Sequence, residues 1–271
     1  MLDDDGLPLD EVGPWAKEKH ERLYKYVDIS RATRRKFVTG SGGATYIDLF
    51  CGSGRAFIRD TDEKIDGSPL VAFKCAIDGG VPFSEIHIAD ADENKCGSAA
   101  KRIFAVGGSA LHYTGKAEDT AAQIVGRLNS FGLHFAFLDP YNLDALPFAV
   151  IETLGRLKHI DMLIHVSAQD LQRNLDTYTK LDDTRLERFA PNWRDHVDLN
   201  QSQRSIRAGI LAHWARNIEA LGLSSAEHAE LITGSAKNQR LYWLVMVSRH
   251  KLAKDFWDKI RNVSGQGELS L

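Results

Sequence analysis

The sequence of 271 residues predicts an α/β protein with a doubly wound, mostly parallel sheet, an N-terminal helix and an insertion after the fifth strand. Three observations predict this fold class. Short apolar runs alternate with helix-like segments from residue 44 to residue 167. The first run ends abruptly in a glycine turn that contains Gly52 and Gly54. The alternation then stops at Gln169, where a polar stretch begins.

The chain divides near residue 40 into a short N-terminal part and one large domain. Residues 1–40 are predicted to be a tail and a helix: 1–13 are acidic and are expected to be disordered, whereas 14–38 carry apolar residues at near-helical spacing. Residues 41–271 are predicted to form one domain, interrupted by an insertion at about 169–205. Insertions at this edge of a sheet commonly shape a substrate pocket.

Each predicted strand is an apolar run bounded by turn residues, and a helix is expected after each of the first four. The parallel strands are expected at 44–50, 85–90, 110–115, 134–140 and 161–167. The helices between them are expected at 68–78, 93–106, 119–130 and 146–157. After the insertion, the pattern predicts a helix at 205–221, a strand at 241–248 and a helix at 251–262. The ligand of such a sheet lies at the carboxyl ends of its strands.

Composition argues against several classes of protein. A net charge of −3 argues against a protein that binds polyanions over its whole surface. No apolar run approaches the roughly 20 residues of a membrane helix, and the N-terminus lacks the pattern of a signal peptide. We therefore expect a cytoplasmic protein with no membrane contact. The three cysteines, Cys51, Cys75 and Cys96, form no C-x-x-C pair, so we expect no disulfide framework and no metal site.

The turn after the first strand predicts a nucleotide-like ligand. Gly52 and Gly54 allow a tight bend and a close approach of the ligand to the backbone. The third glycine of a dinucleotide-binding loop is missing, and Asp48 lies four positions before Gly52. A carboxylate there repels a pyrophosphate and attracts the cationic sulfonium and amino groups of S-adenosylmethionine (SAM). We therefore assign Asp48, Phe50, Gly52 and Gly54 to a SAM site.

Acidic residues after the next two strands extend this candidate site. Asp90 and Asp92 follow the second strand, where a carboxylate accepts hydrogen bonds from ribose hydroxyls. Asp92 alternatively caps the following helix. Ala117 and Glu118 follow the third strand and are candidates for contact with adenine, although Glu118 alternatively caps a helix. All four residues are assigned to cofactor binding.

The segment Asp139-Pro140-Tyr141-Asn142 ends a central strand and is predicted to be catalytic. Pro140 stops the strand. Asp139 and Asn142 can accept hydrogen bonds from an amino group, which raises the electron density on its nitrogen before a methyl group transfers in line. Tyr141 can stack on a planar ring. The structural alternative is a plain turn at the end of a strand.

Three other side chains are of types that are often catalytic, but we interpret them as structural. Cys51 lies in the glycine turn, but no Pro-Cys pair follows the fourth strand, where a cytosine carbon methyltransferase places its thiol. We therefore do not expect Cys51 to be a nucleophile. His134 and His165 lie on predicted strands and are interpreted as satisfied core residues.

Four segments together resemble the SAM-dependent methyltransferase superfamily and, more narrowly, the three-Cys-motif partner protein (TcmP) family. They are Lys19-His20 with Leu23, YIDLFCGSGR at 46–55, GSPLVAF at 67–73 and FLDPYNL at 137–143. The resemblance covers about residues 15–262. It implies a Rossmann-like class I methyltransferase fold, SAM as cofactor and a bacterial context beside a radical-SAM-like or phage-related protein that carries three cysteines.

By this resemblance, Asp48, Gly52 and Gly54 contact the methionine part of SAM. The sequence departs from the amino-methyltransferase pattern at one place. Those enzymes read Asp/Asn-Pro-Pro-aromatic, whereas here the second proline is absent and Tyr141 follows Pro140 directly.

Two functional hypotheses follow, and a third is disfavoured. The first is a methyltransferase that acts on an amino nitrogen, such as that of a nucleic-acid base flipped against Tyr141. Local basic patches support a nucleic-acid partner: Arg31, Arg34, Arg35 and Lys36, and then Arg185, Arg188, Trp193, Arg194, Arg204, Arg207 and Trp214. The second is a non-catalytic SAM-binding subunit that binds the three-cysteine protein. Asp48 and the missing glycine argue against the third, an NAD-dependent oxidoreductase.

Overall fold

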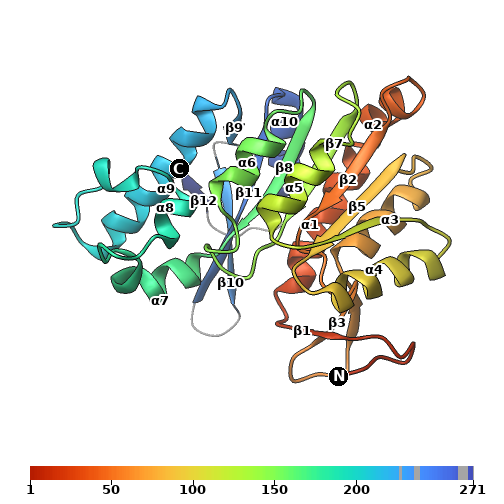
Figure 1. The fold of residues 1–271 in the computed structure, drawn as a ribbon, viewed down its shortest axis with the longest axis horizontal. Coiled ribbons are helices and arrows are strands. Elements are labelled where there is room, and N and C mark those ends of the chain that lie inside the picture. Colours follow the sequence, from red (N-terminus) through yellow and green to blue (C-terminus); the bar gives the residue numbers. More distant parts are fainter. Residues whose placement is uncertain (226–227, 235–238, 262–267, 271) are drawn as a thin grey trace.

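The computed structural model describes residues 1–225, 228–234, 239–261 and 268–270. Within these residues, one large sheet crosses the molecule with its strands in the order β12-β10-β11-β8-β7-β2-β5-β6, and β9 pairs with β11 (Figure 1). The strands are β2 (Ala44–Asp48), β5 (Glu85–Asp90), β6 (Leu111–Thr114), β7 (Leu133–Leu138), β8 (Ile160–Val166), β9 (Ser224–Ser225), β10 (His228–Gly234), β11 (Gln239–Ser248) and β12 (Glu268–Ser270).

The direction of these strands confirms the predicted doubly wound, mostly parallel sheet. Strands β6, β5, β2, β7 and β8 pair in parallel. Strand β11 runs antiparallel to both β8 and β10, so β10 shares the direction of the parallel strands. Among the strands of this sheet, β2 comes first along the chain, yet it lies between β5 and β7. The strand order therefore reverses beside it. A crevice for a ligand is expected where β2 ends.

Helices cover both faces of the sheet. Alternate residues of β7 face opposite cores, since Ala136 and Leu138 pack on one side and Phe135 and Phe137 on the other. The first core is covered by α5 (Ala117–Val125), α6 (Phe148–Leu154), α7 (Ala168–Tyr178), α8 (Arg185–Phe189) and α9 (Gln203–Ala220). The second core is covered by α1 (Ala16–Ile29), α3 (Ser68–Asp78), α4 (Glu93–Ala105) and α10 (Lys251–Arg261).

The N-terminal segment forms part of a small second sheet. Strand β1 (Asp10–Val12) pairs in parallel with β3 (Arg55–Ile58), which pairs antiparallel with β4 (Lys64–Asp66). This sheet lies at the bottom of Figure 1, below α1 and α4. The expectation that residues 1–13 are disordered is therefore wrong.

Ion pairs with distant basic residues explain the order of this acidic segment. The buried carboxylate of Asp3 pairs with Arg55 at 3.0 Å and with Lys64 at 2.7 Å. Asp5 pairs with Arg102 at 2.8 Å. These partners hold the pKa of Asp3 well below its usual range although burial alone would raise it. The charge pattern that suggested a disordered tail is therefore a set of paired side chains.

Two further differences concern helices. The helix predicted at 14–38 consists of α1 and α2 (Arg31–Val38), which meet at Ser30. The polar stretch at about 169–205 is largely helical and contains most of α7, all of α8 and a short 3-10 helix at Trp193–Asp195. Among the residues described, no helix is long and apolar enough to cross a membrane.

Candidate functional site

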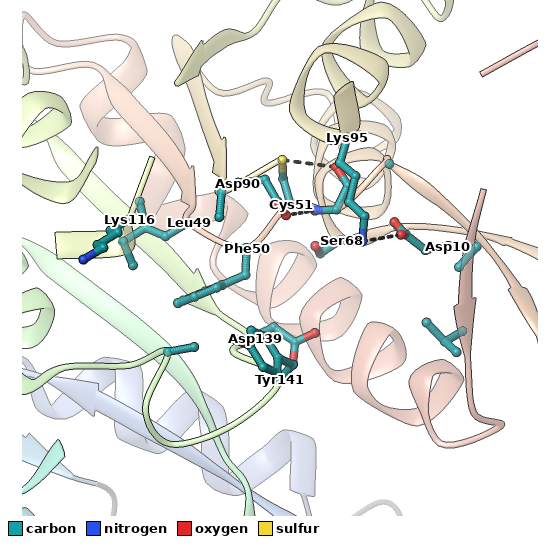
Figure 2. Close-up of a pocket in the computed structure, with 18 of the residues that line it drawn as sticks. Asp10, Leu49, Phe50, Cys51, Ser68, Asp90, Lys95, Lys116, Asp139 and Tyr141 are labelled. Carbon is teal, nitrogen blue, oxygen red and sulfur yellow. Dashed lines mark hydrogen bonds and ion pairs between the residues drawn. The ribbon is translucent and has the colours of Figure 1, made fainter. Parts of the chain in front are cut away.

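A cavity of about 540 Å³ opens at the carboxyl ends of β2, β5, β6 and β7. This volume falls within the usual range of small-molecule sites. Figure 2 shows that several residues predicted from the sequence surround it. The predicted site residues on its wall are Phe50, Gly52, Gly54, Asp90, Ala117, Glu118, Asp139 and Tyr141. Asp48, Asp92, Pro140 and Asn142 are not among the residues that line it.

The glycine turn needs glycine for two separate reasons. Gly52 and Gly54 have φ values of 55° and 79°, a region that residues with a Cβ rarely adopt. A Cβ on Gly54 would lie 2.9 Å from the Cα of Ala99 on α4. The backbone N–H of Gly52 donates a hydrogen bond to Asp90 at 3.0 Å, which fixes the turn against the end of β5.

Asp48 lies beneath the cavity instead of on its wall. Its side chain is fully buried and accepts hydrogen bonds from Ser68 at 2.6 Å, Tyr46 at 3.0 Å and the N–H of Phe50 at 3.1 Å. Burial raises the pKa of Asp48 to about 7, against the lowering effect of these donors. The structure therefore places Asp48 as a support for the turn and for Ser68, which does line the cavity.

The two carboxylates after β5 have different positions. Asp90 lines the cavity, and its two oxygens accept hydrogen bonds from the backbone N–H groups of Gly52 and Asp92 at 3.0 Å each. Asp92 caps α4 through the N–H groups of Asn94 and Lys95. Of the two residues assigned to the ribose, only Asp90 reaches the cavity, and Asp92 takes the helix-capping alternative.

The loop after β6 forms another wall of the cavity. Lys116, Ala117 and Glu118 line it together with Leu49. Glu118 is also paired with Arg188 of α8 at 3.0 Å, which links the polar stretch after β8 to this wall. The residues assigned to adenine are therefore in contact with the cavity.

Asp139 is held between two residues that were not predicted to belong to the site. Lys19 of α1 forms an ion pair with one of its oxygens, and His165 Nδ1 of β8 lies 2.7 Å from the other. Burial alone would raise the pKa of Asp139, but the ammonium of Lys19 and the hydrogen bond with His165 hold it well below its usual range. Asp139 is therefore ionised. His165 is a satisfied residue on its strand, as expected, but the partner that satisfies it is the carboxylate of Asp139.

The other members of the Asp139-Pro140-Tyr141-Asn142 segment separate in space. Tyr141 lines the cavity with 84% of its surface exposed. Pro140 is buried. The amide oxygen of Asn142 accepts a hydrogen bond from the N–H of Ala145 at 2.9 Å, so it stabilises the loop locally. The expectation that Asn142 faces an acceptor is therefore not met in this structure.

His20 also lines the cavity, next to Lys19. Burial, together with the nearby Lys19 charge, lowers the pKa of His20 to about 4, so its imidazole is neutral at physiological pH. His20 was expected to matter only as part of the family resemblance. Its place at the cavity comes from the packing of α1 against α3, which carries Ser68 at its start.

Most of the residues expected to form basic patches have other partners. Arg34 is buried and donates to the carbonyls of Val81 and Val27. Trp193 and Trp214 are buried in the core. Arg185 pairs with Asp183, Arg188 with Glu118 and Asp144, and Arg194 with the carbonyls of Thr179 and Lys180. Arg34, Trp193 and Trp214 are therefore core residues, whereas Arg185 and Arg188 are paired but remain partly exposed.

In the part of the chain that the structure describes, the cysteines and the possible metal ligands form no second reactive or metal-binding site. Cys51, Cys75 and Cys96 are buried free thiols. Burial raises the pKa of Cys51 well above its usual value, which makes it a poor nucleophile. Within the described ranges, no cluster of three or more His, Cys, Asp or Glu residues has the arrangement of a metal site.

Comparison with known proteins identifies the fold. No family model and no curated protein matches the chain. It is similar to protein LPL1258 of Legionella pneumophila, with a TM-score of 0.53 and 7% identity over 90% of this chain and 91% of that one. It is also similar to an O-methyltransferase of Bacillus cereus in complex with S-adenosylhomocysteine (SAH), with a TM-score of 0.50 and 16% identity over 90% of this chain and 85% of that one.

At these identities the likeness concerns the fold and not the substrate. The narrower resemblance to the TcmP family stays a prediction. The chain has the doubly wound α/β fold that its strand pattern predicted, and this Rossmann-like fold is similar to that of the O-methyltransferase.

Proposed function

We propose that this protein is a SAM-dependent methyltransferase that acts on an amino nitrogen. One observation carries the proposal: a single cavity runs from the glycine turn, past Asp90 and the loop at Lys116, to the ionised Asp139. Asp139 thus lies on the wall of the same cavity as the residues suited to a nucleoside.

The wall of the cavity fits the parts of SAM. Leu49, Phe50 and Ala117 offer apolar contact to adenine, and Asp90 offers carboxylate oxygens to the ribose hydroxyls. Gly52 and Gly54 present the backbone of the turn to the cavity. When bound, SAM supplies a methyl group on a cationic sulfur.

Asp139 would orient the methyl acceptor. Each carboxylate oxygen accepts more than one hydrogen bond, so Asp139 can receive an N–H of the acceptor while Lys19 and His165 remain in place. Their contacts keep it ionised, and acceptance of the N–H raises the electron density on nitrogen. The neutral imidazole of His20 is a second acceptor on the same wall. These groups position an amine for in-line attack.

The amino group of an unpaired nucleic-acid base is the acceptor that we favour. Tyr141 lies at the cavity with 84% of its surface exposed, which suits stacking on a planar ring that enters from solvent. Because most of the neighbouring arginines are already paired, the base itself supplies more of the recognition than the phosphate backbone.

The competing proposal is a non-catalytic SAM-binding subunit of a three-cysteine-motif protein. One observation favours it: the Lys19 and His165 contacts already occupy both oxygens of Asp139, while Asn142 bonds to its own loop. On this proposal, the ion pair at Asp139 is structural and the cavity serves only to bind SAM.

Transfer of a tritiated methyl group from SAM into pools of total RNA, DNA and protein separates the two proposals. The wild-type protein is compared with Asp139→Asn and with a matched control, Asp182→Asn, which changes an exposed aspartate outside the cavity. We expect label in nucleic acid with the wild type and Asp182→Asn, and its loss with Asp139→Asn. Equal label with Asp139→Asn would remove the assigned role, and SAM binding without label in any pool would favour the subunit.

A further inference from the structure

An ion pair lies on the cavity wall beside the glycine turn. Asp10 of β1 and Lys95 of α4 both line the cavity, and Lys95 Nζ is 2.9 Å from one oxygen of Asp10. The other oxygen accepts the backbone N–H of Ser53, in the turn itself, at 2.6 Å. The two side chains keep 24% and 42% of their surface exposed, so neither charge is closed off.

Asp10 occupies the space beside Gly52 that a side chain would need. A Cβ on Gly52 would lie 2.7 Å from the Asp10 oxygen, so a side chain there would displace the carboxylate. The glycine thus makes room for a residue of the chain's own N-terminal segment. Asp10 is consequently part of the turn, although 42 positions separate it from Gly52 (52 minus 10).

Arg102 fixes this arrangement from beneath. The same guanidinium nitrogen donates to the carbonyl of Ser53 and to the carbonyl of Pro8, each at 2.7 Å. Its other nitrogens bind Asp5 at 2.8 and 2.9 Å. Because Arg102 is almost fully buried, the N-terminal segment and the glycine turn are held as one unit. Asp10 is therefore positioned before any ligand arrives.

We propose that the Asp10–Lys95 pair binds the amino-acid end of SAM, with Asp10 receiving its ammonium and Lys95 its carboxylate. The inference rests on the proposed function and assigns to the N-terminal segment a role that the family resemblance implied for Asp48. Asp48 is fully buried and does not line the cavity, whereas Asp10 and Lys95 are partly exposed and do. The negative Asp10 and the positive Lys95 lie side by side. They therefore complement the ammonium and the carboxylate of an amino acid.

The layout of the cavity agrees with this assignment. In Figure 2, Asp10 and Lys95 lie to the right, Leu49 and Lys116 to the left, and Asp90 between them. A ligand with adenine at the left and ribose at Asp90 would extend its remaining arm toward the ion pair. The charges are also stable: burial opposes ionisation of Asp10, but the Ser53 N–H and Lys95 hold its pKa below the usual value.

Isothermal titration with two ligands tests the proposal. The ligands are SAH and 5′-methylthioadenosine, which carries the same adenosine and sulfur but lacks the amino-acid end. The variants are Asp10→Asn and Lys95→Gln. Asp4→Asn is the matched control, because it makes the same change in the same segment on a side chain that is 87% exposed. SAH carries no sulfonium charge, so the comparison isolates the amino-acid end.

We expect the wild type to bind SAH at least roughly tenfold more tightly than methylthioadenosine. Asp10→Asn and Lys95→Gln should each weaken SAH binding by about tenfold and leave methylthioadenosine binding within about twofold. Asp4→Asn should bind both ligands like the wild type. Intact methylthioadenosine binding also shows that a variant is folded.

Other binding results would contradict either the proposed function or the assignment of the ion pair. If the wild type binds neither ligand, the proposed function itself fails. If the wild type binds both equally, or if Asp10→Asn keeps the full preference for SAH, the proposed function stands and the ion-pair assignment is wrong. If Asp10→Asn loses both ligands equally, Asp10 only supports the turn and the assignment to the amino-acid end is again wrong.

Discussion

Two aspartates that end or follow neighbouring strands of the sheet have opposite ionisation properties. Asp48 ends β2 and is surrounded by hydroxyl groups and a backbone N–H, so burial prevails and its pKa rises to about 7. Asp139 follows β7 and is also largely enclosed, but Lys19 and His165 hold its pKa well below the usual range. Both carboxylates lie at the carboxyl edge of the same sheet, where Asp48 pairs with Phe137, two residues before Asp139.

The difference shows that position at a strand end does not decide the charge of a carboxyl group. A neutral donor compensates part of the desolvation of a carboxylate, whereas a cation in contact compensates far more of it. Asp48 therefore acts as a hydrogen-bonding support for the glycine turn, and Asp139 presents a negative charge to the cavity.

Removing the cation from Asp139 should have the largest effect. Lys19→Met leaves a buried carboxylate without its charge partner, and we expect the free energy of unfolding to fall by about 3 to 5 kcal/mol. Methyl transfer should fall by at least roughly a hundredfold, because the pKa of Asp139 then rises. Chemical denaturation and initial rates measure the two effects, and Lys19→Arg should recover most of the stability. Unchanged stability in Lys19→Met would mean that the ion pair is not formed.

Asp48 should make stability depend on pH in the direction opposite to an ion-paired carboxylate. Its folded-state pKa of about 7 lies above the ordinary 3.8, so the folded protein keeps a proton that the unfolded chain loses between these values. The free energy of unfolding should therefore fall, by about 2 to 4 kcal/mol, as pH rises from about 4 to above 7. Denaturation at pH 5 and pH 8 should show that Asp48→Asn removes this part of the slope.

Asp182→Asn is the control for that measurement, because it removes an exposed carboxylate and should leave the slope unchanged. A wild-type slope that persists in Asp48→Asn would place the titrating group elsewhere.

His165 should have an intermediate effect, as a positioning residue for Asp139. His165→Gln keeps a donor but loses the geometry that places Nδ1 at 2.7 Å, and we expect kcat to fall by roughly tenfold with KM for SAM unchanged. The acid limb of the kcat profile should also move to higher pH, because Asp139 loses one of the contacts that lower its pKa. A change confined to KM would contradict a role at Asp139.

Tyr141 should have the smallest effect on the protein and act on the acceptor alone. Because the side chain is 84% exposed, Tyr141→Ala should leave the unfolding free energy within about 0.5 kcal/mol of the wild type. If the ring stacks on a base, KM for the acceptor should rise by roughly tenfold, whereas Tyr141→Phe should behave like the wild type. Equal KM values for both variants would remove the stacking role.

The sequence predicted the elements whose signals are local. Helix α3 and strand β5 have the predicted bounds, because a Ser-Pro start, a Gly-Gly stop and an apolar run depend only on neighbouring residues. The glycine turn, Asp90, and the loop at Ala117 also reach the cavity as expected, since parallel strands bring their carboxyl ends to one edge.

The sequence could not predict contacts made by distant parts of the chain. Lys19 and Asp139 are 120 positions apart (139 minus 19), and no local pattern indicates that α1 places an ammonium beside the end of β7. The order of the N-terminal segment has the same origin, because Arg102 and Arg55 neutralise acids that otherwise suggest a disordered tail. The sequence also does not show in which direction a side chain at a strand end points. Asp48 was expected to contact the ligand, but it is buried and does not line the cavity.

A crystal structure of the protein grown with both SAH and NAD tests the central claim most directly. The account predicts SAH in the cavity, with its ribose at Asp90, its adenine between Leu49 and Ala117, and its sulfur toward Asp139. NAD in that cavity, or a cavity closed by the protein's own side chains with neither ligand bound, would contradict it.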